Sequence, residues 1–130
     1  MNIGEAAQAS GVSPKSIRHY ESVGLMPPAH RSDSNYRLYI QADVQTLRFI
    51  RHARTVGFSI ERIRDLLTLW QDRNRSSADV KTLALQHIAE LDRKIDELQA
   101  MRTTLNALAS NCHGDLRPDC PILEQFAEVR

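Results

Sequence analysis

The feature that most constrains the fold is an apolar repeat in the second half of the chain. Apolar side chains recur there at steps of three and four residues: Ala84, Ile88, Leu91, Ile95, Leu98, Met101, Leu105 and Leu108. The spacing is close to a coiled-coil heptad and predicts one helix over residues 77–110, about 50 Å long at 1.5 Å per residue. Since charged residues crowd its other faces, the apolar stripe needs a second helix to cover it, and we expect a homodimer.

The first forty residues predict a helix-turn-helix motif followed by a wing. A short apolar helix ends at Gly11, and Ser13 then caps a second helix that starts at Pro14. Two helices joined by a short glycine-containing turn form the helix-turn-helix pattern. Residues 35–40, Asn-Tyr-Arg-Leu-Tyr-Ile, alternate as a strand does, and a hairpin here would form the wing.

The remaining segments complete a mainly α-helical fold. Residues 41–75 predict a helix pair that completes the first domain, and its second helix is expected to face inward through Ile60, Ile63, Leu66, Leu67 and Trp70. Ser76 or Ser77 would cap the long helix of residues 76–110. Residues 111–130 then predict a loop and a short helix, so the expected domains are 1–40, 41–75, 76–110 and 111–130.

Composition and charge limit the function. Residues 1–75 carry eleven basic and seven acidic side chains (net +4), whereas residues 76–130 carry six and nine (net −3). A basic front half favours a nucleic-acid-binding module. A membrane-spanning apolar run and a secretory signal are both missing from the sequence, so we expect a cytoplasmic protein without membrane association and with reduced thiols. Because we find no convincing catalytic constellation, we expect that the protein is not an enzyme.

Basic and tyrosine side chains cluster on the motif and the wing. The second helix carries Lys15, Arg18, His19 and Tyr20, and the wing carries Arg31, Tyr36, Arg37 and Tyr39. These side chains suit phosphate contacts with double-stranded DNA, and Arg18 could also reach a guanine edge. The alternative is that Tyr20 and Tyr39 are half-buried core residues and the arginines are only solvated.

Two cysteines in the last segment form the second candidate site. Seven residues separate Cys112 from Cys120, and Pro121 suits the first position of a helix that would place Cys120 at its N-cap, where a thiolate is favoured. Thiolates select soft ions such as Cu(I). The alternatives are a zinc site completed by His113, Asp115 and Asp119, a reversible disulfide, or two unrelated thiols.

In order along the chain, these segments resemble the MerR family of bacterial transcription regulators, and in particular its copper-efflux branch. The matching segments are MNIGEAAQASGVSPKSIRHYESVGL, SNYRLY, FIRHARTVGFSIERIRDLL, SSADVK and CHGDLRPDCPIL. The resemblance implies a winged-helix dimer joined by an antiparallel coiled coil. It also implies a promoter with an overlong spacer, which the metal-bound protein distorts so that RNA polymerase can use it.

The resemblance also assigns residues. It implies DNA contacts at Lys15, Arg18, Tyr20, Tyr36, Arg37 and Arg54, and one Cu(I), Ag(I) or Au(I) ion bound by Cys112 and Cys120. Ser77 matches the position where zinc- and mercury-responsive relatives have a third cysteine, which favours a two-coordinate site here. Within the branch that the chain resembles, metal preference is linked to the positions that match His113 and Pro118. His113 fits neither the copper nor the gold pattern, whereas Pro118 is more like the gold-responsive members.

We therefore expect a regulator that activates metal-efflux or detoxification genes in response to Cu(I), Ag(I) or Au(I). A thiol redox-responsive or Zn(II)-responsive regulator of the same fold is an alternative. A cytosolic metal buffer or chaperone is the alternative from another class, and it would need the two thiols but not the basic front half.

Overall fold

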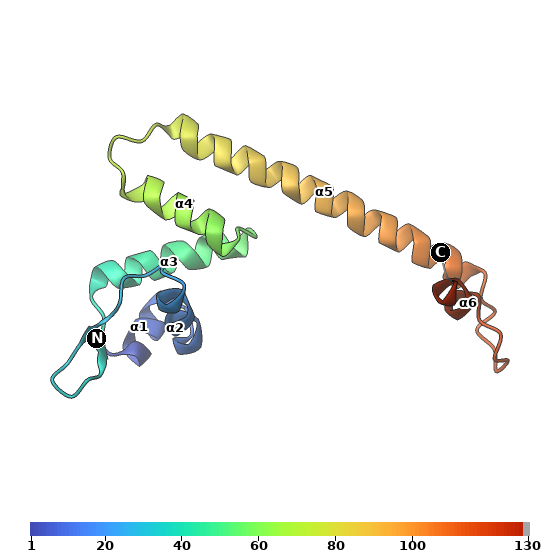
Figure 1. Ribbon diagram of the computed structural model, residues 1–130, viewed down its shortest axis with the longest axis horizontal. Coiled ribbons are helices and arrows are strands. Elements are labelled where there is room, and N and C mark those ends of the chain that lie inside the picture. The colour runs from blue at the N-terminus through green and yellow to red at the C-terminus, as the bar shows by residue number, and fades with distance from the viewer. Residues whose placement is uncertain (129–130) are drawn as a thin grey trace. The chain divides into compact units, whose positions relative to one another are not determined.

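A computed structural model describes residues 1–128, and its fold is mainly helical, as the sequence predicts. In chain order the elements are α1 (Ile3–Ser10), α2 (Pro14–Ser22), β1 (His30–Arg31), β2 (Arg37–Leu38), α3 (Gln41–Thr55), α4 (Ile60–Gln71), α5 (Ser77–Ser110) and α6 (Pro121–Ala127) (Figure 1). The chain divides into two compact units, Met1–Val80 and Lys81–Arg130. None of the described helices is both long enough and apolar enough to cross a membrane.

Local capping explains why α1 and α2 form a helix-turn-helix. Asn2 Oδ1 accepts a hydrogen bond from Glu5 N at 2.8 Å, and Glu5 Oε1 accepts one from Asn2 N at 3.0 Å, which is a capping box at the start of α1. Gly11 ends α1 in the left-handed region with φ 77°. Ser13 Oγ then accepts from Ser16 N at 3.1 Å and caps α2. The predicted motif is confirmed.

The wing, residues 30–39, contains less strand than the sequence predicts. β1 and β2 pair antiparallel with His30 opposite Leu38 and Arg31 opposite Arg37. The expected strand over residues 35–40 is wrong in length because β2 covers only Arg37–Leu38. Asn35 has φ 65°, a left-handed conformation that belongs to a turn, and its N–H bonds to Ser32 O at 2.8 Å.

Helices α1 to α4 enclose the core of the first unit. Its largest fully buried hydrophobic side chains are Ile17, Met26, Val44, Leu47, Ile50 and Ile63. The expected inward position of Trp70 is wrong, because Trp70 is 40% exposed. Its ring instead stacks on Phe49 of α3, with 4.5 Å between the ring centroids.

Helix α5 runs without a break over the residues that the apolar repeat predicts (Figure 1). Ser76 is its cap, since Ser76 Oγ accepts from Asp79 N at 3.3 Å. Large apolar side chains along α5 are more than half exposed in the single chain: Leu85, Ile88, Ile95, Leu98, Met101 and Leu105. The short helix α6 follows, with Pro121 at its first position and Cys120 as its N-cap residue.

Candidate nucleic-acid interface and thiol loop

A basic groove lies between α1, α2 and the wing. It has a volume of about 470 Å³ and is lined by Asn2, Ile3, Arg18, Arg31, Ser32, Asn35, Tyr36, Arg37 and Leu38. Four of the predicted DNA-contact residues therefore meet in one place, with Arg18 coming from α2 and Arg31, Tyr36 and Arg37 from the wing. Tyr36 is 72% exposed, so its ring is available to a ligand. Three guanidinium groups around one groove suit a polyanion.

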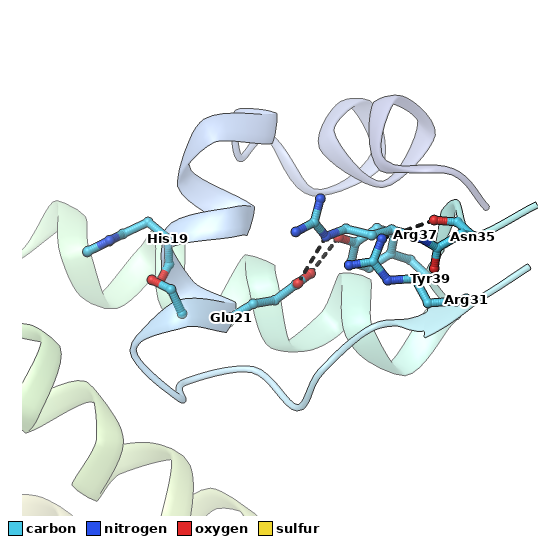
Figure 2. A network of polar contacts seen from close by, with 7 residues as sticks. His19, Glu21, Arg31, Asn35, Arg37 and Tyr39 are labelled. Carbon is cyan, nitrogen blue, oxygen red and sulfur yellow. Dashed lines mark hydrogen bonds and ion pairs between the residues drawn. The ribbon is translucent and has the colours of Figure 1, made fainter.

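Glu21 connects α2 to the wing behind this groove. Tyr39 Oη donates to Glu21 Oε1 at 2.5 Å, and Arg37 Nε donates to Glu21 Oε2 at 3.3 Å (Figure 2). The side chain of Glu21 is only 11% exposed. Nearby, Arg31 Nη1 donates to Asn35 O at 3.1 Å, which braces the turn of the wing.

A second basic groove lies beside the N-terminus of α2. It has a volume of about 380 Å³ and is lined by Gly11, Val12, Ser13, Ser16, Tyr20, Arg51, Arg54 and Thr55. Two further predicted contact residues, Tyr20 and Arg54, meet here. The positive end of a helix dipole attracts phosphate oxygens, so the start of α2 adds to the attraction of Arg51 and Arg54.

The other predicted contact residues on α2 are Lys15 and His19, and both side chains are exposed. The alternative reading of Tyr39 is correct, because Tyr39 is 2% exposed and belongs to the core. Tyr20 is half-buried and packs against that core. Burial, followed by the hydrogen bond to Glu21, raises the pKa of Tyr39 above its ordinary value.

Sequence reasoning missed Arg51, which α3 places in the second groove. A Cβ built on Gly11 would lie 3.1 Å from the guanidinium carbon of Arg51, so this arginine lies against the turn of the motif. Arg48, Arg51 and Arg54 follow one another at steps of three residues, which places them near one side of a helix. This three-residue spacing is the sequence signal that could have identified Arg51. Arg48 has a structural role, since it donates to Ala9 O at 3.1 and 2.9 Å.

The two cysteines bracket the loop between α5 and α6. Both are free thiols of intermediate burial. Cys112 lies two residues beyond the end of α5, and its N–H bonds back to Ala109 O at 3.1 Å. At the other end, Cys120 O accepts from Glu124 N at 3.0 Å in the first turn of α6. Both ends of the loop are therefore held by helices. Ser77, the third position that the resemblance assigns, is the first residue of α5.

Inside the loop, Asp115 binds Arg117. Asp115 Oδ2 accepts from Arg117 Nε at 2.8 Å and Asp115 Oδ1 accepts from Arg117 N at 2.9 Å. This contact lowers the pKa of Asp115. Gly114, with φ 65°, turns the chain before it. Within residues 1–128, the His, Cys, Asp and Glu side chains form no group of three or more that could hold a metal ion. The described part of one chain therefore does not assemble the zinc alternative with His113 and Asp119.

Comparison with known proteins identifies the relatives of this chain. The family model described as "MerR HTH family regulatory protein" matches residues 1–69, and the one described as "MerR, DNA binding" matches residues 44–108. The chain is 62% identical over 128 residues to "HTH-type transcriptional regulator HmrR" of Sinorhizobium medicae (strain WSM419), covering 98% of this chain and 87% of the relative. It is 61% identical over 127 residues to "Heavy metal-dependent transcription regulator 2" of Rhizobium meliloti (strain 1021), covering 98% and 86%.

Among solved structures, the transcription regulator PbrR691 from Ralstonia metallidurans CH34, in complex with lead(II), is similar over the whole chain. The TM-score is 0.84 at 35% sequence identity, and the match covers 98% of this chain and 99% of that one. The similarity therefore includes the helix-turn-helix, the long helix and the thiol loop.

Proposed function

The chain belongs to the MerR family of regulatory proteins, a family of transcription regulators rather than enzymes, and from this premise we propose that it is a metal-sensing activator. The proposed signal is Cu(I), Ag(I) or Au(I), bound as one ion by Cys112 and Cys120. The observation that carries the proposal is the pair of free, half-buried thiols that bracket one short loop. The protein would act in the cytoplasm on genes for metal efflux or detoxification.

The two basic grooves are the proposed DNA interface. Arg18, Arg31, Tyr36 and Arg37 line the first, and Tyr20 and Arg54 line the second. Lys15 and His19 are exposed on α2 and would add contacts. In a helix-turn-helix the second helix enters the major groove, and a wing beside it contacts the backbone. Since phosphate contacts dominate, DNA affinity should fall steeply with salt.

The donor chemistry of the loop favours a soft monovalent ion. Two thiolates and one M⁺ leave a net charge of −1, whereas a structural Zn²⁺ site needs four ligands. Among residues 1–128, no three His, Cys, Asp or Glu side chains gather to hold a metal ion, so the two sulfurs are the proposed donors. The name of the Rhizobium meliloti relative, "Heavy metal-dependent transcription regulator 2", supports metal sensing in general. The restriction of the signal to copper, silver and gold rests on the resemblance of the loop to the copper-efflux branch.

We propose that α5 joins two copies of the chain in an antiparallel coiled coil. Its exposed apolar side chains need a cover, and a matching stripe on a second copy supplies one. A helix of 34 residues is about 50 Å long, so Ser77 and Cys112 of one chain stand at opposite ends of it. Antiparallel pairing would bring the partner's Ser77 beside the thiol loop. Because this position holds a serine and not a third cysteine, the ion would keep only its two sulfur ligands.

Metal binding would then act on DNA through the dimer. Shifting a two-state equilibrium from 1:99 to 99:1 takes about 5.5 kcal/mol of differential affinity. Bending a promoter costs on the order of 1–6 kcal/mol. Metal–thiolate bonds in two sites per dimer can supply free energy of this size, so ion binding can favour a distorted promoter that RNA polymerase recognises.

In-vitro transcription from a promoter with an overlong spacer tests the proposal. We expect buffered Cu⁺, Ag⁺ or Au⁺ to activate the wild type, Zn²⁺ and Hg²⁺ to fail, and Cys112→Ser or Cys120→Ser to abolish the response. Leu116→Ala is the matched loop control, because Leu116 is fully exposed in the same loop, and it should respond as the wild type does.

Three outcomes would contradict the proposal. Activation by an oxidant without metal would indicate a thiol redox regulator. Metal uptake without specific promoter binding would indicate a metal buffer. Equal metal uptake by the wild type and Cys120→Ser would show that the thiol pair is not the site.

A further inference from the structure

Two hydrogen bonds link α2 to the wing, and both end on the carboxylate of Glu21. Arg37 Nε donates to Oε2 at 3.3 Å and Tyr39 Oη donates to Oε1 at 2.5 Å, across sequence separations of 16 and 18 residues. Figure 2 shows the carboxylate of Glu21 reaching from the end of α2 toward Arg37 and Tyr39, while His19 lies apart from them. One side chain therefore connects the two elements that line the first groove.

From this geometry we infer that Glu21 is a positioning residue for DNA binding, which orients Arg37 toward a phosphate. The inference rests on the proposed function, in which Arg37 is a DNA contact. A guanidinium has five N–H donors, and Glu21 takes only the one on Nε, so the two terminal nitrogens keep four for a phosphate. Because the guanidinium is planar, a bond at Nε also sets the direction of those four.

The anchor of this contact is rigid. Tyr39 is 2% exposed, and its backbone is bound to the first residue: Tyr39 N donates to Met1 O at 2.7 Å and Met1 N donates to Tyr39 O at 2.9 Å. A buried tyrosine held at both its backbone and its hydroxyl fixes the carboxylate of Glu21. Arg37, whose side chain is 30% exposed, then loses fewer conformations when it binds DNA.

The negative charge of Glu21 makes the inference testable, because repulsion and positioning predict opposite changes in DNA affinity when Glu21 is removed. A carboxylate near a phosphate-binding surface repels DNA, so on electrostatic grounds alone its removal should tighten binding. If Glu21 positions Arg37, its removal should weaken binding and also remove the phosphate contact of Arg37. The number of phosphate contacts is measurable, because the logarithm of the DNA association constant falls linearly with the logarithm of the salt concentration. The slope is about −0.9 per contact.

The experiment is a salt titration of binding to a mixed-sequence DNA duplex by fluorescence anisotropy. Glu21→Ala should weaken binding about tenfold. Its salt slope should become shallower by about 0.9 per protomer, which is about 1.8 for a dimer. Arg37→Ala should give the same change, and the double variant should be no worse than either single variant. Glu21→Gln, which keeps one acceptor oxygen, should be intermediate.

Asp33→Asn is the matched charge control, since Asp33 is an exposed carboxylate in the turn of the wing. It should leave the salt slope unchanged and bind DNA equally well or slightly more tightly. Tyr39→Phe tests the anchor, because it removes the hydrogen bond that fixes the carboxylate of Glu21 but leaves Glu21 able to pair with Arg37. It should lower the thermal midpoint and weaken DNA binding less than Glu21→Ala does.

The outcomes separate this inference from the proposed function. If Arg37→Ala changes neither affinity nor slope, the proposed contact of Arg37 is wrong. If Arg37→Ala changes both but Glu21→Ala tightens binding, or if the two losses add in the double variant, the positioning role of Glu21 is overturned.

Discussion

Tyr39 shows how one residue can be read in two ways from sequence. Its place among Tyr36 and Arg37 suggests a surface tyrosine that contacts DNA. The structure instead buries its ring and gives its hydroxyl to Glu21. A buried phenol that donates to a carboxylate resists ionisation, and this is why the pKa of Tyr39 is raised.

This shift predicts a loss of stability in alkali. The unfolded chain releases the Tyr39 proton above about pH 10, whereas the folded chain holds it to higher pH. The unfolded state then binds fewer protons, so the free energy of unfolding should fall as the pH rises above about 10. Tyr39→Phe should cost about 1 kcal/mol at neutral pH but show a flatter decline in alkali. Urea unfolding at a series of pH values measures both effects.

Tyr36→Phe is the control for this prediction, because Tyr36 is 72% exposed. It should keep the alkaline decline of the wild type. A decline that is equally steep in Tyr39→Phe would contradict the assignment to Tyr39.

At the scale of elements, the turn of the helix-turn-helix depends on backbone that only glycine adopts easily. Gly11 has φ 77°, and a Cβ there would lie 3.1 Å from the guanidinium of Arg51. Gly4, inside α1, meets nothing closer than Asn2 Oδ1 at 3.4 Å. The same substitution should therefore have opposite effects at the two positions.

Gly11→Ala should destabilise the protein by about 1–2 kcal/mol, the cost of a left-handed alanine. Gly4→Ala should stabilise it by up to about 1 kcal/mol, because alanine is the better helix former. Thermal unfolding of both variants measures the difference. If Gly11→Ala is as stable as the wild type, the turn does not require a left-handed glycine at position 11.

At the scale of the whole molecule, most of the apolar stripe of α5 is exposed among the residues that the structure describes. This apolar stripe includes Ile95 and Leu98, which are 51% and 63% exposed. Burial of a leucine is worth about 1.5–3 kcal/mol, so a stripe of such residues can join two chains firmly. The proposed metal switch needs this dimer, because it places two DNA-binding units on one promoter.

Leu98→Glu should disrupt the dimer contact that the apolar stripe of α5 would form. Each dimer would carry two glutamates in place of two interface leucines, so the dissociation constant of the dimer should rise at least about 100-fold. Sedimentation velocity measures the association directly. Glu97→Gln, one residue away on the polar side, should remain dimeric. If Leu98→Glu dimerises as the wild type does, α5 does not form the interface through this stripe.

Sequence alone determined the helical elements and the thiol pair, because local signals specify them. Ser13, Pro14 and Gly11 mark the helix-turn-helix, the apolar repeat marks α5, and the two cysteines lie eight positions apart in one loop. Tertiary structure decided what depends on approach through space. It exposed Trp70, buried Tyr39, and brought Arg51 to the turn of the motif and Glu21 to the wing. Such contacts join residues far apart in sequence, so capping and periodicity carry no record of them.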